Sequence, residues 1–292
     1  MRSSKASTTD RLPPLWARRA QRGPLGALVA LSLALFVGGC ATATKAPPPA
    51  VTEDTRAQAI ELAVSLTRAG MDVSTLAARG SLEYKASGSN HFFRFELISQ
   101  RPSNFHFTII DPLGRPAVRV ISDGDRLMAL EYGPAKATIG DAGSNALGSM
   151  MPVGFSPSDF ISLLAASLIP LPADAELAPA SDGKTRLRVT PGGNWEGSQW
   201  LVNVSQGPNG PRLDGFTATI EDEPPIVASY GQFEPQTVED IGKTVDFPNR
   251  LDLGWGRDQS VLVRYEEVRL GFPAQPELFS TEVPKGFSQV GL

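Results

Sequence analysis

Two hydrophobic periods divide the chain. From Thr52 to Gly70 the apolar residues recur at helical spacing and share one broad face, formed by Ile60, Leu62, Ala63, Val64, Leu66 and Ala69. Acidic residues in the first turn and a glycine at the end are typical of helix termini. We therefore expect a helix over residues 52–70 with one face buried.

From Gly80 onward the hydrophobic period is two. In segments 93–97 and 105–109 large apolar side chains alternate with polar ones, which is typical of half-buried strands. Asp123-Gly124 and Asn209-Gly210 separate such segments and favour tight hairpin turns. The alternation predicts ten or eleven antiparallel strands, which begin at 80–84 and also cover 118–120, 127–132, 186–190, 199–204, 216–220, 226–233, 251–255 and 261–270.

Residues 141–172 interrupt this alternation. The sequence SPSD at 156–159 combines a capping serine, a proline at the first helical position and an acid in the first turn, and an apolar face continues to Leu168. We expect a helix here and a second short one over 144–151. The order of elements indicates a mostly β fold with helices, of the α+β class. Its sheet should curl to bury its faces, and the inserted helices should cover the concave side.

The first forty residues carry export signals. Six basic residues precede an apolar run at 25–37, which is shorter than the roughly 20 residues needed to span a bilayer and suits a signal-peptide core. The run ends in Val37-Gly38-Gly39-Cys40, which resembles a bacterial lipobox and implies lipid on Cys40, the only cysteine. We expect a signal peptide over 1–39, the lipidated cysteine and a flexible tether over 40–51, and one domain over 52–292.

Charge and composition narrow the possible functions. Cleavage before Cys40 removes six of 27 basic and one of 31 acidic residues, which leaves a net charge near −9. An acidic surface argues against nucleic acid and against electrostatic attraction to anionic lipid, so membrane contact should come from lipid or apolar groups. The two histidines, His91 and His106, lack carboxylates at ligand spacing. We therefore expect no metal, no cofactor and no enzyme, although spacing leaves open a hydrolase built of carboxylates alone.

One turn stands out within residues 105–120, which read FHFTIIDPLGRPAVRV. Pro112 restricts one turn dihedral, Gly114 permits a positive φ, and the Asp111 side chain can bond its own backbone. Leu113 therefore lies at the tip of a turn between two strands. There it either folds back onto the core or projects into solvent.

The order of these features resembles the LolB-type outer-membrane lipoprotein receptors of the LolA/LolB-like superfamily. The shared features are the lipobox, the tether, the helix, a strand led by glycine (GSLEY at 80–84), an aromatic strand, the Pro-Leu-Gly turn, the helices and a late Tyr230-Gly231. Agreement extends from Gly80 to Leu168 and is looser to Leu270. The chain departs from the family in Asp111, where asparagine is common, in an acidic segment at 234–246 that reads as an insertion, and in a tail at 273–292.

The resemblance implies a half-open antiparallel β-barrel, closed by helices, with an apolar cavity for acyl chains. It implies a lipid-anchored receptor that accepts lipoproteins from a LolA-like periplasmic carrier and inserts them into the outer membrane through Leu113, held between Pro112 and Gly114. Ala41 after the cysteine favours the outer membrane. The side chains that could line the cavity, or equally be plain core, are Phe93, Phe95, Phe105, Phe107, Phe160 and Leu164.

The acidic segment and the tail keep a second interpretation open. A lipoprotein of the same fold could have a structural, sensory or protein-binding role in the cell envelope instead of handling lipid.

Overall fold

The computed structural model describes residues 53–86, 88–143, 147, 155–168, 172–178, 184–192 and 195–291. The expected signal peptide, Cys40 and the tether lie outside this part of the chain. So does the helix expected over 144–151, apart from Leu147.

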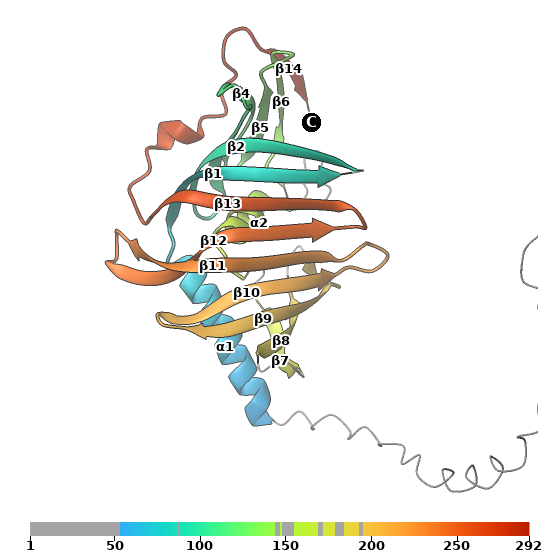
Figure 1. Ribbon diagram of the computed structural model, residues 1–292, viewed down its shortest axis with the longest axis vertical. Helices are drawn as coiled ribbons and strands as arrows, with labels where there is room; N and C mark the ends of the chain where they lie inside the picture. Colours follow the sequence, from blue (N-terminus) through green and yellow to red (C-terminus); the bar gives the residue numbers. More distant parts are fainter. Residues whose placement is uncertain are drawn as a thin grey trace, which may run out of the picture. The chain divides into compact units, whose positions relative to one another are not determined.

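In the described residues, fourteen strands form a single sheet in the order β14-β6-β5-β4-β3-β2-β1-β13-β12-β11-β10-β9-β8-β7 (Figure 1). Adjacent strands are antiparallel, except that β14 adds in parallel to β6. The strands are β1 (Thr75–Ala86), β2 (Ser89–Gln100), β3 (Asn104–Ile110), β4 (Pro116–Asp123), β5 (Arg126–Glu131), β6 (Lys136–Asp141), β7 (Pro172–Ala178), β8 (Thr185–Pro191), β9 (Gln199–Gly207), β10 (Gly210–Thr219), β11 (Ile226–Val238), β12 (Lys243–Trp255), β13 (Gln259–Leu270) and β14 (Ser288–Gly291).

The fold is mostly β with few helices, as predicted, but the sheet has more strands than the expected ten or eleven. The unpredicted strands are β6, β7 and β14. Their sequences, KATIGD, PADAELA and SQVG, contain few of the β-branched and aromatic residues that signal strands. Both β7 and β14 are edge strands, and each pairs with one neighbour only.

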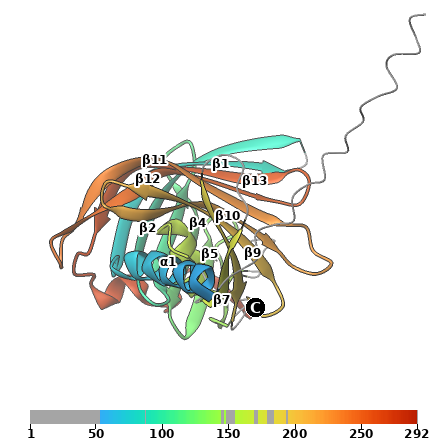
Figure 2. The ribbon, with the colours of Figure 1, turned by 90° about the horizontal axis from the view of Figure 1, so that it is seen from below.

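Two α-helices of the described part of the chain lie on the concave side of the sheet. α1 (Glu53–Met71) contacts β7, β8 and β10, and Ala59, Ala63 and Leu66 on its buried face belong to the main core. α2 (Pro157–Leu164) lies inside the curve of the strands, as the view from below shows (Figure 2). In the described residues no helix combines the length and the apolar character that a membrane crossing requires.

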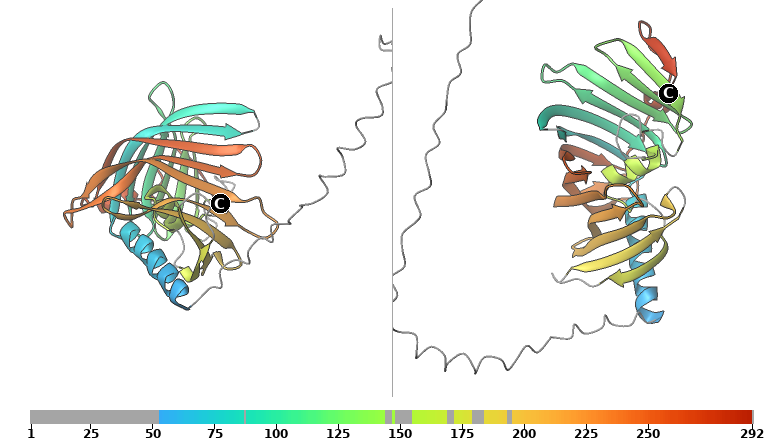
Figure 3. Two further views of the ribbon diagram at one scale, coloured as in Figure 1. Left: turned by 60° about the horizontal axis from the view of Figure 1, so that its bottom comes forward. Right: turned by 90° about the vertical axis from the view of Figure 1, so that its right-hand side faces the viewer.

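The tail at 273–292 is a part of this fold. After a 3₁₀ helix (Pro276–Phe279), Val283 and Phe287 pack against a second apolar cluster that includes Ile121, Met128 and Ile139 on β4, β5 and β6. Figure 3 shows β14, in red, at the edge of the sheet beside the green strands. The tail therefore covers the outer face of one end of the sheet and then extends its edge as β14.

The acidic segment at 234–246 is part of the sheet. It forms the far end of the β11–β12 hairpin, which is paired continuously from Ile226 with Trp255 to Val238 with Lys243, apart from one irregular position. Its acids face partners that are distant in sequence. Glu239 pairs with Arg269, Asp240 accepts from Ser74, and Asp246 accepts from Asn209. The acids therefore fasten the hairpin to its neighbours.

Candidate functional site: an apolar cavity that reaches the rim of the sheet

A cavity of about 590 Å³ lies between α2 and the inner faces of β1–β6, β12 and β13. Its lining is largely aliphatic and aromatic, and the charged side chains in it are Glu131 and Lys136. The volume falls in the range of about 300–1,000 Å³ that is typical of small-molecule sites. The sheet and α2 thus enclose space that a solidly packed core would have filled.

The structure brings the six candidate cavity residues together. Phe93 and Phe95 on β2, Phe105 and Phe107 on β3, and Phe160 and Leu164 on α2 all line this space. The Phe160 ring lies 5.1 Å from the Phe105 ring and 5.7 Å from the Phe107 ring, measured between centroids. These contacts hold α2 against β3, so the same aromatic residues support the fold and form the cavity wall.

Sequence reasoning missed the part of the lining that comes from the end of the chain. Leu251, Leu253 and Trp255 on β12 and Val261 and Val263 on β13 complete the wall. β13 pairs with β1, about 180 residues earlier in the chain. Alternation shows which side of a strand is buried, but it does not show which distant strand closes the curve. The apolar alternation in β12 and β13 did indicate that these side chains are buried, but it did not identify β1 as the strand that pairs with β13.

The start and the end of α2 are held by different groups. At its start, the Ser156 amide donates to the Asp159 carboxylate (2.9 Å) and the Asp159 amide donates to the Ser156 hydroxyl (3.2 Å), as the SPSD signal predicts. At its end, the hydroxyl of Tyr230 donates to the Leu163 carbonyl (2.9 Å) and that of Tyr265 to the Leu164 carbonyl (3.0 Å). Burial raises the pKa of both phenols, so both remain protonated donors.

α2 ends at Leu164, so it is shorter than the sequence predicts from the apolar pattern that continues to Leu168. Ala166 has a φ of +49°, which ends the helical backbone after Leu164. The pattern continues because the residues after the helix are also buried, not because they are helical.

A partly buried arginine, Arg101, joins α2 to the segment after α1. Nε of Arg101 donates to the Val73 carbonyl and Nη1 to the Ser162 hydroxyl, both over 3.1 Å. No described carboxylate lies within ion-pair distance of this guanidinium, and burial lowers the pKa of Arg101. Arg101 is a connection that the sequence did not indicate.

The Pro-Leu-Gly turn joins β3 to β4 with the geometry that the sequence predicts. Gly114 has a φ of +80° and donates to the Asp111 carbonyl (2.9 Å), while Oδ1 of Asp111 accepts from the amides of Leu113 and Arg115 (2.9 Å each). The Arg115 amide and then its guanidinium hold the pKa of Asp111 below its ordinary value. The Leu113 side chain is 76% exposed, so it projects from the turn and does not fold back onto the core.

This turn belongs to one end of the sheet, which we call the rim. In an antiparallel meander the β1–β2, β3–β4 and β5–β6 turns lie at the same end, and the β12–β13 turn joins them because β13 pairs with β1. Glu131 and Lys136 flank the β5–β6 turn, are partly exposed, and face each other over 3.7 Å while lining the cavity. The cavity therefore reaches the surface at the rim.

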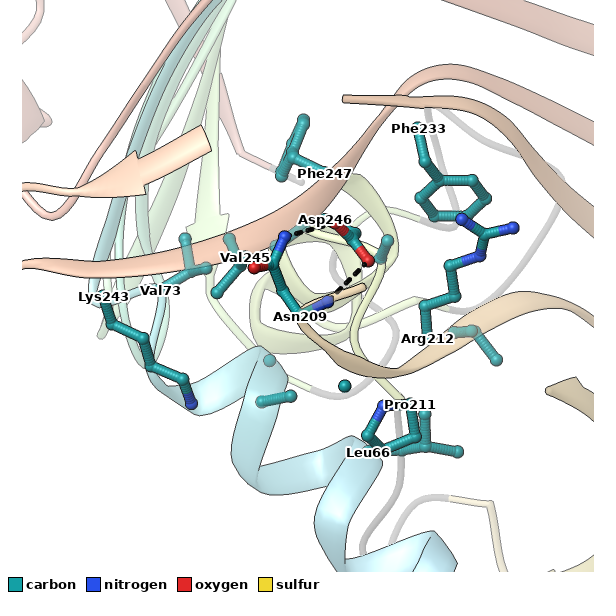
Figure 4. A pocket seen from close by; sticks show the side chains of 16 residues that line it. Leu66, Val73, Asn209, Pro211, Arg212, Phe233, Lys243, Val245, Asp246 and Phe247 are labelled. Atoms are coloured by element: carbon teal, nitrogen blue, oxygen red, sulfur yellow. Dashed lines mark hydrogen bonds between the residues drawn. The ribbon is translucent and has the colours of Figure 1, made fainter. Parts of the chain in front are cut away.

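A second hollow lies behind α2, between α1, the β9–β10 turn and β12 (Figure 4). Nδ2 of Asn209 donates to the Asp246 carboxylate (2.6 Å) in its wall, and Lys243 reaches Asp72 next to it. Its volume is about 60 Å³. A water molecule needs about 10–15 Å³ on this measure, so the hollow accommodates only a few waters and no acyl chain.

In the part of the chain that the structure describes, no group of three or more His, Cys, Asp and Glu side chains is placed to hold a metal ion. His106 is occupied structurally, with Nδ1 3.1 Å from the Leu278 carbonyl and Nε2 3.1 Å from the Thr108 hydroxyl, and its burial lowers its pKa. The other histidine, His91, is exposed.

Comparison with known proteins identifies the fold. No family model matches the sequence, and no curated protein matches it. Among solved structures, an outer membrane lipoprotein-sorting protein domain from Vibrio parahaemolyticus is similar with a TM-score of 0.56, at 10% identity over 76% of this chain and 96% of that chain. A DUF1329 family protein from Desulfovibrio piger also has a TM-score of 0.56, at 13% identity over 78% and 98% of the two chains.

A LolA superfamily protein from Nitrosomonas europaea is similar with a TM-score of 0.50, at 12% identity over 75% of this chain and 97% of that chain. The three likenesses cover nearly the whole of the neighbouring structures. This chain therefore has the open, curled β fold with helices that LolA-like proteins have.

Proposed function

We propose that the protein is a lipid-handling receptor that holds the acyl chains of lipoproteins in its cavity and passes them to a membrane at the rim. The observation that supports this proposal most is the cavity itself. A fold without such a role would gain stability by filling 590 Å³ of apolar space with side chains.

The energetics define what the cavity must do. An acyl chain of ~15 methylenes costs about 12 kcal/mol to expose to water, at about 0.8 kcal/mol for each methylene. A receptor must shield that surface and still release it. The cavity should therefore bind hydrocarbon about as well as a bilayer does, and no better.

The test is binding of a fluorescent fatty acid to the purified chain from Ala41 onward. We expect the probe to enter the cavity, with a rise in emission, and a lipidated peptide to displace it. An unlipidated peptide of the same sequence is the control. A purified protein that leaves the probe in water would contradict acyl-chain binding and favour the structural, sensory or protein-binding role.

Leu113 supports the second half of the proposal. Its exposed side chain lies at the rim that the cavity reaches, so it can enter a bilayer next to a departing acyl chain. We expect Leu113→Glu to lower lipoprotein delivery about tenfold in cells depleted of their own receptor, because a carboxylate is costly to place in lipid. The measurement is the share of lipoprotein recovered in the outer-membrane fraction.

Leu113→Met is the matched control for that experiment, since it retains an apolar side chain at the turn. Delivery by the Leu113→Glu variant at the level of wild type would show that Leu113 has no part in insertion.

The anchor and the location complete the proposal. Cys40 would carry the lipid that tethers the domain to the outer membrane on its periplasmic side, and the cargo would come from a LolA-like soluble carrier. The features that support this are the lipobox-like sequence and Ala41 after the cysteine. The lipoprotein-sorting neighbour is consistent with a role in the cell envelope.

A further inference from the structure

The rim carries two exposed apolar side chains, Phe92 and Leu113. On β2, Phe93 and Phe95 line the cavity, so Phe92 faces the opposite side, where it is 60% exposed. The last residue pair between β2 and β3 is Arg94 with Ile110. Phe92 lies two residues beyond that pair on β2, and Leu113 lies three residues beyond it in the β3–β4 turn. The two side chains therefore project from the same part of the rim.

The charges around them differ from those of the whole chain, whose net charge is −4. The acids near these side chains are already paired: Glu83 with Lys85, Glu96 with Arg79 and Asp111 with Arg115. Arg94 is exposed and forms no ion pair with any described residue. This part of the rim thus presents an unneutralised guanidinium beside Phe92.

A second cation lies two strands further along, beyond β3. The guanidinium of Arg119 on β4 lies 5.6 Å from the Tyr132 ring and donates to the Thr108 hydroxyl, and no described carboxylate is within ion-pair distance of it. Thr108 is paired with Arg119 on one side and with Glu96 on the other, and Arg94 is two residues from Glu96 on the same face of β2. Arg94, Thr108 and Arg119 therefore occupy neighbouring positions on one face of the sheet. Guanidinium groups bind phosphates well, often through two hydrogen bonds.

We propose that these residues form a bilayer-docking surface, the rim patch, which consists of Phe92, Arg94, Leu113 and Arg119. Phe92 and Leu113 enter the interfacial layer of a phospholipid bilayer, and Arg94 and Arg119 bind lipid phosphates. An exposed apolar pair flanked by cations is the arrangement by which proteins bind membrane surfaces. The net negative charge of the chain predicts no electrostatic attraction to anionic lipid. The two cations of the rim patch would provide such attraction locally.

Docking through the rim patch would direct the surface end of the cavity toward the lipid. The purpose of this docking rests on the proposed function, because an acyl chain held in the cavity could then move into the bilayer over a short path. Its test does not depend on acyl-chain binding, so failure of one proposal can be told apart from failure of the other.

The experiment uses the full chain, reconstituted through its own anchor into vesicles of phosphatidylethanolamine and phosphatidylglycerol. The chain has one cysteine, so a wild-type sample that takes no thiol label shows that lipid occupies Cys40. A polarity-sensitive dye is placed on Phe92→Cys, and quenching by brominated phospholipids is measured. The matched control is Ile241→Cys, because Ile241 is 53% exposed and lies in the β11–β12 turn, at the opposite end of the sheet from the rim.

We expect bromolipid to quench the dye at residue 92 at least about threefold more than the dye at residue 241. Adding Arg94→Glu should remove most of that difference, and Arg94→Lys should retain it. Equal quenching at the two positions would overturn the proposal. A dye at residue 92 that changes its emission only when a soluble protein is added would also overturn it, since the patch would then bind protein and not lipid.

Discussion

Replacing Ala129 by tryptophan should abolish most acyl-chain binding without unfolding the protein. Ala129 lines the cavity between Val120 and Thr138, its neighbours across the strands, and the new indole would occupy space that is now empty. If the ring displaces about three methylenes of the ligand, binding weakens by about 2.4 kcal/mol, at about 0.8 kcal/mol each. That corresponds to about a 50-fold rise in Kd for the fluorescent fatty acid.

The control for this substitution is Val227→Trp. Val227 is an exposed residue of β11 that does not line the cavity, so the same side chain is added where it blocks nothing. Urea unfolding of both variants separates blocking from misfolding, because a folded Ala129→Trp protein keeps the wild-type midpoint or exceeds it. A folded Ala129→Trp variant that binds the probe as tightly as wild type would show that the ligand lies elsewhere.

The second large effect is expected at Gly80, where the sheet bends. The register between β1 and β13 shifts between Arg79 and Gly80, and a Cβ atom on Gly80 would lie 1.9 Å from the Arg264 carbonyl oxygen. The obstacle is backbone of the paired strand, which cannot move aside alone. We expect Gly80→Ala to lower the free energy of unfolding by about 3 kcal/mol, seen as a lower urea midpoint.

Gly231→Ala is the comparison for that measurement. Gly231 lies in β11 of the same sheet, and a Cβ atom there would meet nothing within 4 Å. Its substitution should change the free energy of unfolding by less than about 1 kcal/mol. Similar midpoints for the two alanine variants would mean that β1 and β13 approach less closely at Gly80 than the structure shows.

The sequence predicts the local structure of this protein well, because local structure depends on nearby residues. Alternation and hairpin dipeptides predicted most strands, and the SPSD signal predicted the start of α2. The same holds for the turn at Leu113, whose proline, glycine and aspartate each restrict their own backbone. Whether the leucine packs inward or projects depends on surrounding strands, so the sequence left both possibilities open.

Features that depend on distant residues were missed or misread. Glu239 in the acidic segment bonds Arg269, 30 residues away, and nothing in the local sequence indicated this contact. Tyr230 was noted for its motif, but nothing local indicated that its hydroxyl would bond the end of a helix 67 residues earlier. Curvature is also a property of the whole sheet, so the cavity could be expected only through a resemblance to other proteins.

The two edges of the sheet affect how copies of the protein behave side by side. An open sheet normally ends in strands whose free amides and carbonyls invite another chain to pair. Here one edge is β14, which is only four residues long, and the other is β7, which α1 contacts and an ion pair between Arg56 and Asp174 secures. Among the described strands, neither edge offers a long unprotected ladder. Where the proposed lipid anchor would concentrate the protein on a surface, it can therefore remain monomeric, with little tendency to aggregate through strand exchange.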